Sequence, residues 1–498
     1  MNINLFKPLW KITCIKIILI VFIITGFSNN IKTEDITIEN RQSLVDFIYH
    51  APIRINNNID FTTINGVVKG NGTQYDPYVI EGWRIEATGI VAIYIGNTSV
   101  YFIIRNNYLQ GVEFYNVTNG WIENNTISES YVGISLQYSN SNTIIYNNFS
   151  KITRRAIYLY FSSNNTIVNN DASKASYPLK SWTIWLYDSP YNTIMFNRLF
   201  DNSVGILVGT YGNGNLSSTG NQIVNNTIFG HLYGINIYNS SGNILKNNII
   251  TENSNAGIRL SSSLYTHLEN NYLYNNGIVI EGDNIEHWTT HTISSDNLVN
   301  NKPVYYYKNQ SNITIPSNGG QVILANTTNS IINGLVLNHT SIGISLGFST
   351  RNSITNNNIS FCGTAIYLYS SFENSITKNN ITSNNITGIY ITSPSSNNRI
   401  HHNNFINNNV GGRQAYDSAG TNFWNETIEG NFWNDYDTPT EGCYDNDTNL
   451  ICDLPYVIDR TTNSMDYYPL ILSGLSPRDI KPDLWLNITN ISNVAPFE

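Results

Sequence analysis

Hydrophobic and polar residues alternate over short stretches of the chain, and Asn, Ser and Gly interrupt the alternation at regular intervals. Residues 133–150 form one such unit: a Gly-Ile start, a short alternating apolar run, an Asn/Ser corner, a second short strand-like run and an Asn-Asn corner. Alternation with a period of two predicts short strands, each with one buried face. Because similar units follow one another along most of the chain, the pattern predicts a repeat protein.

Each repeat is anchored by an Ile that usually follows Gly or Ala, and successive anchors within a run lie roughly 22 to 29 residues apart. The anchors are Ile134, Ile157, Ile184, Ile206, Ile235 and Ile258, then Ile344, Ile366 and Ile389. Such a period is typical of a solenoid. The Leu-x-x-Leu-x-Leu pattern of leucine-rich repeats and the period of an amphipathic helix are both missing. We therefore predict an all-β fold, a right-handed parallel β-helix solenoid with Asn-rich corners and capped ends.

Asn-Asn pairs recur in step with the anchors and mark the expected corners. The pairs are Asn124-Asn125, Asn147-Asn148, Asn169-Asn170, Asn225-Asn226, Asn247-Asn248, Asn270-Asn271, Asn379-Asn380 and Asn403-Asn404. Asn tolerates the left-handed backbone that a sharp corner needs. Asn side chains in successive coils can also hydrogen-bond to one another, as they do in cross-β ladders. The sequence thus predicts coils about 4.8 Å apart with Asn side chains stacked at the corners.

The two ends and the middle of the chain depart from the repeat. A basic stretch with Lys7, Lys11 and Lys16 precedes an apolar run at residues 17–27, which predicts a secretory signal or an uncleaved N-terminal anchor. The expected segments are 1–28 (signal peptide or N-terminal anchor), 29–65 (N-terminal cap), 66–282 (first coils), 283–330 (insertion or irregular coils), 331–435 (second coils), 436–472 (C-terminal capping motif) and 473–498 (tail). Caps are expected because an open coil would expose apolar side chains and unpaired backbone groups.

Charge and cysteine usage indicate an exported protein without a nucleic-acid partner. The net charge of −9 comes with only 12% charged residues and no basic stripe. About twenty Asn-x-Ser/Thr sequons, such as Asn71-Gly-Thr, agree with export, although an Asn- and Thr-rich repeat also makes sequons by chance. Only Cys443 and Cys452 lie close enough in sequence to suggest a disulfide. We predict an extracytoplasmic protein whose membrane contact is limited to the N-terminal segment.

The outward positions one and three residues after each anchor are often aromatic. These candidates for carbohydrate binding are Tyr158, Tyr160, Trp185, Tyr187, Tyr238, Tyr367, Tyr369 and Tyr390. Rings about 5 Å apart on a flat face can stack on sugar rings while their polar edges reach hydroxyl groups. Alternatively, like residues stack on a parallel sheet for stability alone. Trp185 is the foremost candidate, since we expect it to face solvent.

Four residues near the C-terminus alternate oxygen ligands as a calcium loop does: Asp445, Asp447, Asn449 and Asp453. The Gly and the closing Glu of such loops are missing, so a polar turn closed by a disulfide is the alternative. Copper is not expected, because the chain has three Met and no cluster of His, Met and Cys. By pattern, His401-His402 is an exposed corner pair, and residues 287–291 are structural.

Several motifs lie outside the regular coils: His287–His291, Lys302–Tyr307, Gly320–Leu324, Asn431–Asp435 and Pro455–Asp459. Together with the Asn-x-Ile coils, they resemble the NosD-type β-helix proteins, which belong to a wider group of carbohydrate-binding and sugar-hydrolase β-helix domains. The resemblance covers about residues 66–470. It implies a right-handed β-helix. The family takes its name from a periplasmic protein of copper-site maturation, a role that its look-alikes need not share.

No catalytic residues are assigned from the sequence, because the Asn-Thr-Asp, Asp-Asp and Gly-His-Gly motifs of polygalacturonase-like enzymes are missing. Arg154, Arg155 and Asp188 could approach one another across adjacent coils. The predicted function is binding of a polysaccharide or glycan without catalysis. The alternatives are a polysaccharide lyase, hydrolase or epimerase, a structural surface protein, and NosD-like copper-site maturation.

Overall fold

The computed structural model describes residues 47–87, 89–172, 182–209 and 218–473. They form a right-handed β-solenoid of about 14 turns, so the predicted fold class is confirmed. The predicted signal or anchor segment at residues 1–28 and nearly all of the predicted tail lie outside the described residues. Among those residues, no helix has the length and hydrophobicity needed to cross a membrane.

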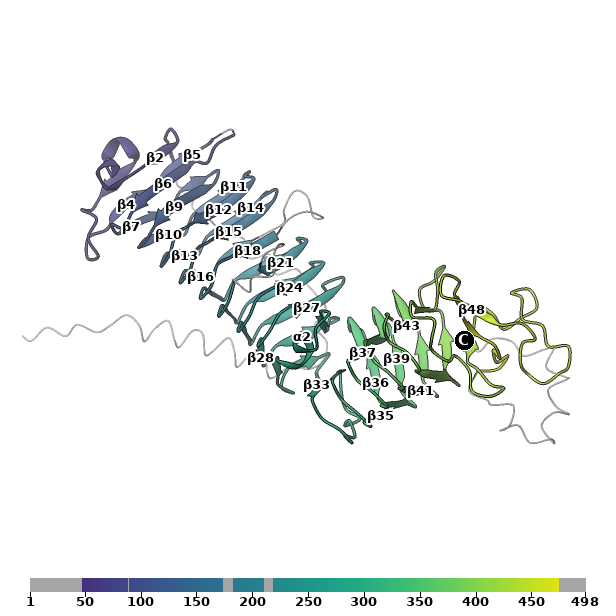
Figure 1. Ribbon diagram of the computed structural model, residues 1–498. Coiled ribbons are helices and arrows are strands. Elements are labelled where there is room, and N and C mark those ends of the chain that lie inside the picture. The colour runs from purple at the N-terminus through teal and green to yellow at the C-terminus, as the bar shows by residue number, and fades with distance from the viewer. Residues whose placement is uncertain (1–46, 88, 173–181, 210–217, 474–498) are drawn as a thin grey trace, which may run out of the picture. The chain divides into compact units, whose positions relative to one another are not determined.

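Three sheets form the faces of the first coils, and each coil adds one strand to each sheet (Figure 1). Sheet B contains β2 (Ile53–Ile55), β6 (Ile93–Thr98), β9 (Val112–Val117), β12 (Val132–Gln137), β15 (Arg155–Tyr160), β18 (Trp182–Tyr187), β21 (Val204–Val208), β24 (Tyr233–Tyr238), β27 (Ala256–Ser261) and β30 (Ile278–Glu281). Sheet C runs from β3 (Val67–Lys69) to β31 (Thr292–Ile293), and sheet A begins with β1 (Ile48–Tyr49) and reaches β32 (Leu298–Val299). β2 lies within the segment predicted as a cap and already pairs with β6 in register.

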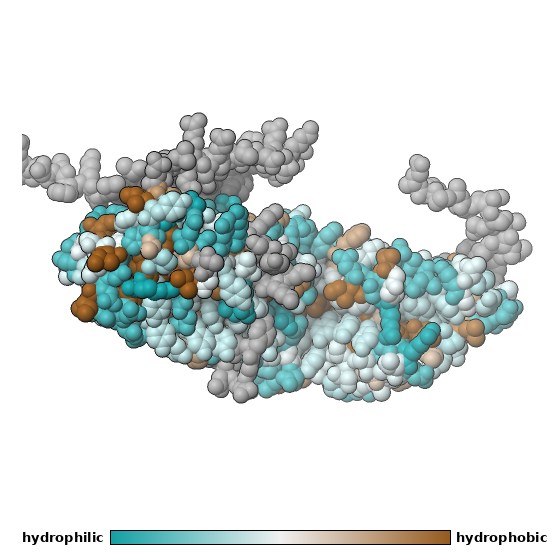
Figure 2. Space-filling model, turned by 90° about the horizontal axis from the view of Figure 1, so that it is seen from above, coloured by the Kyte–Doolittle hydropathy of each residue, from teal (hydrophilic) through white to brown (hydrophobic). Residues whose placement is uncertain are grey.

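The coil interior is filled by aliphatic side chains from alternate strand positions. The anchor Ile residues stack on one another from coil to coil, as Ile134 pairs with Ile157 and Ile157 with Ile184. All three are essentially buried. The space-filling view shows a mostly hydrophilic surface on which hydrophobic residues gather most densely at the end of the N-terminal coils (Figure 2).

A continuous ladder of buried Asn side chains runs beside the strands. From Asn125 onwards, each amide oxygen accepts both the backbone N–H and the side-chain N–H of the Asn one coil earlier, with side-chain N–O distances of 2.9–3.1 Å. The ladder comprises Asn107, Asn125, Asn147, Asn170, Asn197, Asn226, Asn248, Asn271 and Asn297. It satisfies backbone groups that would otherwise be buried without partners.

The two Asn of each pair have different roles. The left-handed residue is the one before the ladder Asn: Asn124, Asn169 and Asn225 have φ near +50°. Tyr146 (φ +56°) and Phe196 (φ +57°) occupy the equivalent position in other coils. The corner conformation therefore does not require Asn, whereas each of the nine ladder positions is Asn.

Between the two runs of coils the chain direction in the sheet reverses. β32 pairs antiparallel with β33 (Lys302–Lys308), which pairs in parallel with β34 (Gln321–Ala325). The second stack continues through β37 (Ile342–Gly347), β40 (Thr364–Tyr369), β43 (Thr387–Ile391) and β46 (Ala415–Asp417). β33 and β34 lie within the segment predicted as irregular.

A short helix, α2 (Ile285–Thr289), lies over this junction and buries Trp288 completely. The indole ring stacks on Tyr369, with ring centroids 5.9 Å apart and planes at 13°. Gly347 lies under the ring, because a Cβ added there would be 2.2 Å from an indole carbon. His291 is buried, and its Nε2 lies 2.8 Å from the carbonyl oxygen of His287. Residues 287–291 thus pack as part of the scaffold.

The C-terminal end is closed by a loop-rich segment with β48 (Tyr456–Asp459) and β49 (Ser464–Asp466). Cys443 and Cys452 form a disulfide. The expectation of an exposed His401-His402 corner was wrong: the side chains are 11% and 17% exposed. The rings are held by each other, with 2.7 Å between the two Nδ1 atoms, and His402 Nε2 lies 2.7 Å from the buried Glu429 carboxylate. Glu426 and Glu429, whose backbone groups hydrogen-bond to each other across a tight turn, contact the two His rings.

Candidate functional site

A groove of about 780 Å³ lies on the outer face of sheet B over its N-terminal coils. The sheet supplies the floor, and residues of the corner loops supply one side. The lining residues are Arg54, Ala87, Gly89, Ile90, Val91, Tyr94, Gln110, Val112, Glu113, Glu129, Ser130, Tyr131, Val132, Ser135, Gln137, Arg155 and Tyr158. The volume is large enough for a chain of a few sugar units or a drug-sized ligand.

Register explains why these side chains meet. Parallel pairing without offset places equivalent outward residues of successive coils in one column. One column runs Arg54, Tyr94, Glu113, Ser135, Tyr158 and then Trp185. Ser135 is the small residue in the middle of this column, with larger side chains on both sides. The hollow therefore forms where the outward residues of β12 are least bulky.

Glu113 is the acidic group on the floor of the groove. Its Oε1 accepts a hydrogen bond of 3.2 Å from Nε2 of Gln137. Burial raises the pKa of the Glu113 carboxyl, and the positive charge of Arg54 partly offsets the rise. Burial and, to a smaller extent, the Glu113 carboxylate raise the pKa of Tyr94. Glu113 is thus a half-buried carboxyl poised to titrate above its ordinary range.

Arg155 closes the C-terminal end of the groove. Its guanidinium carbon lies 4.2 Å from the ring centroid of Tyr158, 4.4 Å from that of Trp185 and 5.4 Å from that of Trp182. Among the described residues its Nε has no hydrogen-bond partner. Burial and the neighbouring Arg154 lower the pKa of the Arg155 guanidinium. The side chain is fixed by aromatic rings and not by a carboxylate.

An aromatic strip runs beside the groove along the C-terminal ends of the sheet B strands. It consists of Tyr115, Tyr138, Tyr160, Phe161 and Tyr187, whose neighbouring ring centroids lie 4.5–6.2 Å apart. Tyr115, Tyr138 and Phe161 are each at least 40% exposed. Tyr158 of the groove lies 6.1 Å from Tyr160, so groove and strip are contiguous. The predicted Tyr158, Tyr160 and Tyr187 meet on this surface.

The expectation that Trp185 faces solvent was wrong. Trp185 points away from the coil interior, as the alternation predicts, but it is only 7% exposed. Its ring packs against Trp182, 4.8 Å away, and against Tyr158, and its indole N–H donates to the Gly209 carbonyl at 3.0 Å. Neighbouring outward side chains cover it and form a second, smaller apolar cluster outside the coil. Tyr238 packs against the same cluster.

The aromatic candidates of the second run of coils do not extend the surface of sheet B. Trp288 stacks over both Tyr367 and Tyr369, which leaves these two rings partly buried beneath α2. Tyr390 stacks on Tyr416 at 4.8 Å. These tyrosines belong to a separate stack on the sheet that contains β40 and β43.

The predicted approach of Asp188 to the arginines does not occur. Arg155 begins β15 and pairs with Trp182, whereas Asp188 follows the last residue of β18, at the opposite end of the strands. The sequence prediction left out Tyr115, Tyr138 and Phe161 of the aromatic strip. In the outward column of the groove it left out Arg54, Tyr94 and Glu113. Continuing the anchor series backwards to Val112, Ile93 and Ile53 would have placed all three in the outward column.

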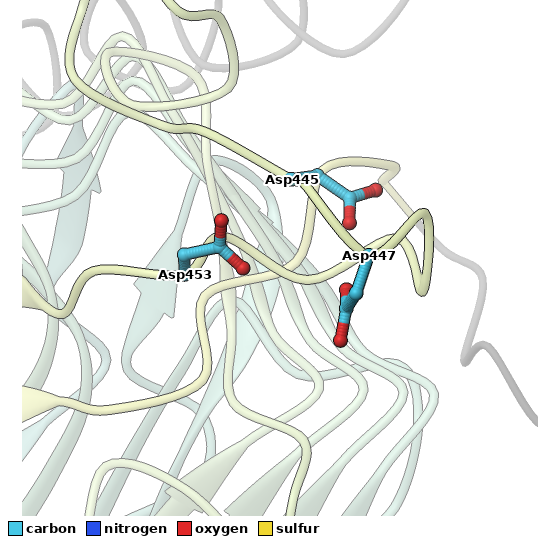
Figure 3. A group of neighbouring side chains, drawn as sticks. All are labelled: Asp445, Asp447 and Asp453. Carbon is cyan, nitrogen blue, oxygen red and sulfur yellow. The ribbon is translucent and has the colours of Figure 1, made fainter.

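The acidic loop brings together three of its four predicted ligands. One carboxylate oxygen from each of Asp445, Asp447 and Asp453 lies within 4.8 Å of the others, and Figure 3 shows them around the loop. Asp445 also accepts the backbone N–H groups of Asn449 and Leu450, each at 3.0 Å. The Asn449 side chain contacts Asp447 at 2.9 Å. An all-oxygen set of this kind suits calcium better than copper.

Comparison with protein families identifies the chain. The family model described as "Periplasmic copper-binding protein (NosD)" matches residues 184–309 and 304–438, more than half of the chain. The chain belongs to the NosD family. A second model, "Right handed beta helix region", matches residues 55–223, which include most of the groove of this NosD-family chain. No curated protein sequence matches it significantly.

Solved structures similar to this NosD-family chain are other β-helix proteins. They include the catalytic domain of an α-1,3-glucanase in complex with tetrasaccharides (15% identity, TM-score 0.34, covering 71% of this chain and 63% of that one). They also include a tailspike protein of an E. coli bacteriophage (11%, 0.33, 68% and 72%) and a periplasmic alginate epimerase (12%, 0.29, 70% and 83%). The chain thus spans less than two thirds of the glucanase domain. At these identities the likeness concerns the fold alone.

Proposed function

We propose that this NosD-family chain is an exported protein that binds a polysaccharide or glycan along the outer face of sheet B, without cutting it. The observation that carries the proposal is the contiguity of the groove with the aromatic strip. The groove offers polar groups from Glu113 and Gln137 for sugar hydroxyls, and the strip offers exposed tyrosine rings for the apolar faces of sugars. An extended polymer that lies across the coils could contact the groove and the strip at once, because the outward positions of successive coils are aligned in columns.

Truncation of the strip should weaken binding without unfolding the protein. We expect the wild type to be retarded in native gels that contain one of a panel of neutral and acidic polysaccharides. Tyr115→Ala and Tyr160→Ala should each raise the dissociation constant about 3- to 10-fold, since an aromatic stacking contact contributes about 0.5–1.5 kcal/mol. Trp121→Ala is the matched control, because Trp121 is 44% exposed but lies on β10 (Gly120–Glu123) of sheet C.

Unchanged binding in both tyrosine variants would show that the ligand does not bind to the outer face of sheet B. Failure of the wild type to bind any polysaccharide of the panel would contradict the proposal itself.

A second candidate, a polysaccharide-active enzyme, is favoured by the half-buried Glu113 with its raised pKa in the groove. Release of reducing or unsaturated sugar ends, lost in Glu113→Gln, would replace binding with catalysis as the function.

For the acidic loop we propose a bound calcium ion with a structural role. Calcium should raise the melting temperature by a few degrees at millimolar concentration, because a ligand that binds only the folded state stabilises it. Asp447→Asn should abolish this rise. It should leave the melting temperature without calcium unchanged, since Asp447 is exposed. A wild-type melting temperature that is the same with and without calcium would contradict the proposal.

A further inference from the structure

Arg155 differs from most of the described arginines in lacking a carboxylate partner. Six of them form an ion pair with a carboxylate: Arg84, Arg105, Arg198, Arg259, Arg351 and Arg413. Arg155 has no such contact among the described residues, and its Nε is buried without a hydrogen-bond partner. Within the described part of the protein, Arg155 is a half-buried cation without a carboxylate partner at the edge of a groove, in a chain with a net charge of −9. It is therefore a candidate binding site for an anionic group of a ligand.

The aromatic rings around Arg155 hold the guanidinium in place without neutralising it. Cation–π contact with Tyr158 and Trp185 offsets part of the cost of burial. The rings carry no charge, so the positive field remains available to an anion in the groove. A guanidinium fixed in advance loses little further freedom when it forms a paired hydrogen bond with a planar anion.

Neither acidic residue that lines the groove is the missing partner: Glu129 is paired with Lys151 at 2.7 Å, and Glu113 lies on a more distant coil. Glu113 is on β9 and Arg155 on β15, two coils apart, which is about 10 Å at the spacing of parallel strands. Glu113 accepts a hydrogen bond from Gln137, and the positive charge of Arg54, two positions away in the column, partly offsets the rise of its pKa. The groove therefore has a cation near each end, with the Glu113 carboxyl between them and the Glu129 carboxylate neutralised by Lys151.

We propose that the glycan bound in this groove carries negatively charged groups, either carboxylates or sulfate esters, and that Arg155 recognises one of them while Arg54 attracts another. This inference rests on the proposed glycan-binding function and narrows its ligand to acidic sugars. Arg155 determines specificity through its fork of N–H donors. The negative charge of Glu113 repels anionic groups. The groove therefore favours a ligand whose negative charges do not lie in its middle.

The test compares polymers that differ in charge and share a backbone. We expect polygalacturonate or dextran sulfate to bind at least 10-fold more tightly than fully methyl-esterified polygalacturonate or dextran, respectively. Arg155→Gln should remove most of that difference by lowering the affinity for the charged polymer towards that for its uncharged counterpart. Arg155→Lys should give an intermediate affinity, because it keeps the charge but loses the fork. Glu113→Gln should act in the opposite direction and tighten binding of the charged polymer. The two acidic polymers separate carboxylate from sulfate recognition.

Circular dichroism and the melting temperature check that the variants fold. If Arg155→Gln does not fold, the salt dependence of the wild type carries the test. Raising NaCl from about 50 to about 500 mM should weaken the charged polymer severalfold and leave its uncharged counterpart unaffected. Equal binding of charged and uncharged polymers, or binding of the uncharged ones alone, would overturn this inference while leaving glycan binding intact. Binding of no polysaccharide at all would overturn the proposed function as well.

Discussion

Replacing Asn147 with alanine is expected to lower the free energy of unfolding by about 2–4 kcal/mol. Asn147 is 1% exposed, and its Oδ1 accepts the backbone N–H of Asn125 at 3.0 Å. Its Nδ2 donates to the carbonyl of Ile122 at 2.8 Å and to Asn170 Oδ1 at 3.1 Å. Alanine provides none of these groups and leaves the N–H of Asn125 buried without its side-chain partner.

The next residue provides a matched control. Asn148 begins β14 (Asn148–Ser150) and is exposed. Asn148→Ala should therefore change the free energy of unfolding by no more than about 0.5 kcal/mol. Urea denaturation followed by circular dichroism measures both variants. Equal effects of the two substitutions would show that the ladder adds nothing beyond the backbone pairing.

Trp288→Ala is expected to cost about 3–5 kcal/mol, in the range of large-to-small substitutions at fully buried aromatic residues. The indole ring is completely buried, stacks on Tyr369 and donates its N–H to the Gly282 carbonyl at 3.0 Å. Tyr306, in turn, donates its hydroxyl hydrogen to the Trp288 carbonyl at 2.5 Å. Loss of the ring removes the packing contact that holds α2 on the second run of coils.

Ile285→Ala on the same helix is the control. Because Ile285 is 37% exposed, this substitution should lower the free energy of unfolding by well under half as much as Trp288→Ala. Melting temperature and tryptophan fluorescence report the two variants. In Trp288→Ala, the rings of Tyr367 and Tyr369 should become accessible to solvent. A melting temperature of Trp288→Ala that matches that of Ile285→Ala would mean that the junction does not depend on the indole ring.

The coils could be predicted from sequence because their determinants are local and repeated. An aliphatic anchor, most often Ile, and a ladder Asn recur from coil to coil, so the same pattern can be recognised many times along the chain. The Asn-Asn pairs led to the ladder, although the sequence alone did not distinguish the left-handed Asn124 from the ladder residue Asn125.

The groove could not be predicted because it depends on what lies beside a residue and not on the residue itself. Ser135 lines the groove because it is small and stands between Glu113 and Tyr158 in the same column. Trp185 fills space outside the coil for the converse reason, since Trp182 of its own strand and Arg155 of the preceding coil close over it. Outward direction follows from alternation, whereas exposure depends on the sizes of neighbours one coil away.

Because the Asn ladder repeats once per coil, one whole coil can be gained or lost without breaking the pattern of its hydrogen bonds. Ladder neighbours are separated by 22 or 23 residues in some coils and by 27 or 29 in others. Extra residues are accommodated elsewhere in the coil, because the side-chain bonds remain at 2.9–3.1 Å in every case. An in-frame duplication or loss of one whole repeat would renew the same bonds on both sides of the splice. Gene rearrangement could therefore lengthen or shorten the outer face in steps of one strand spacing, while the outward residues change independently of the ladder.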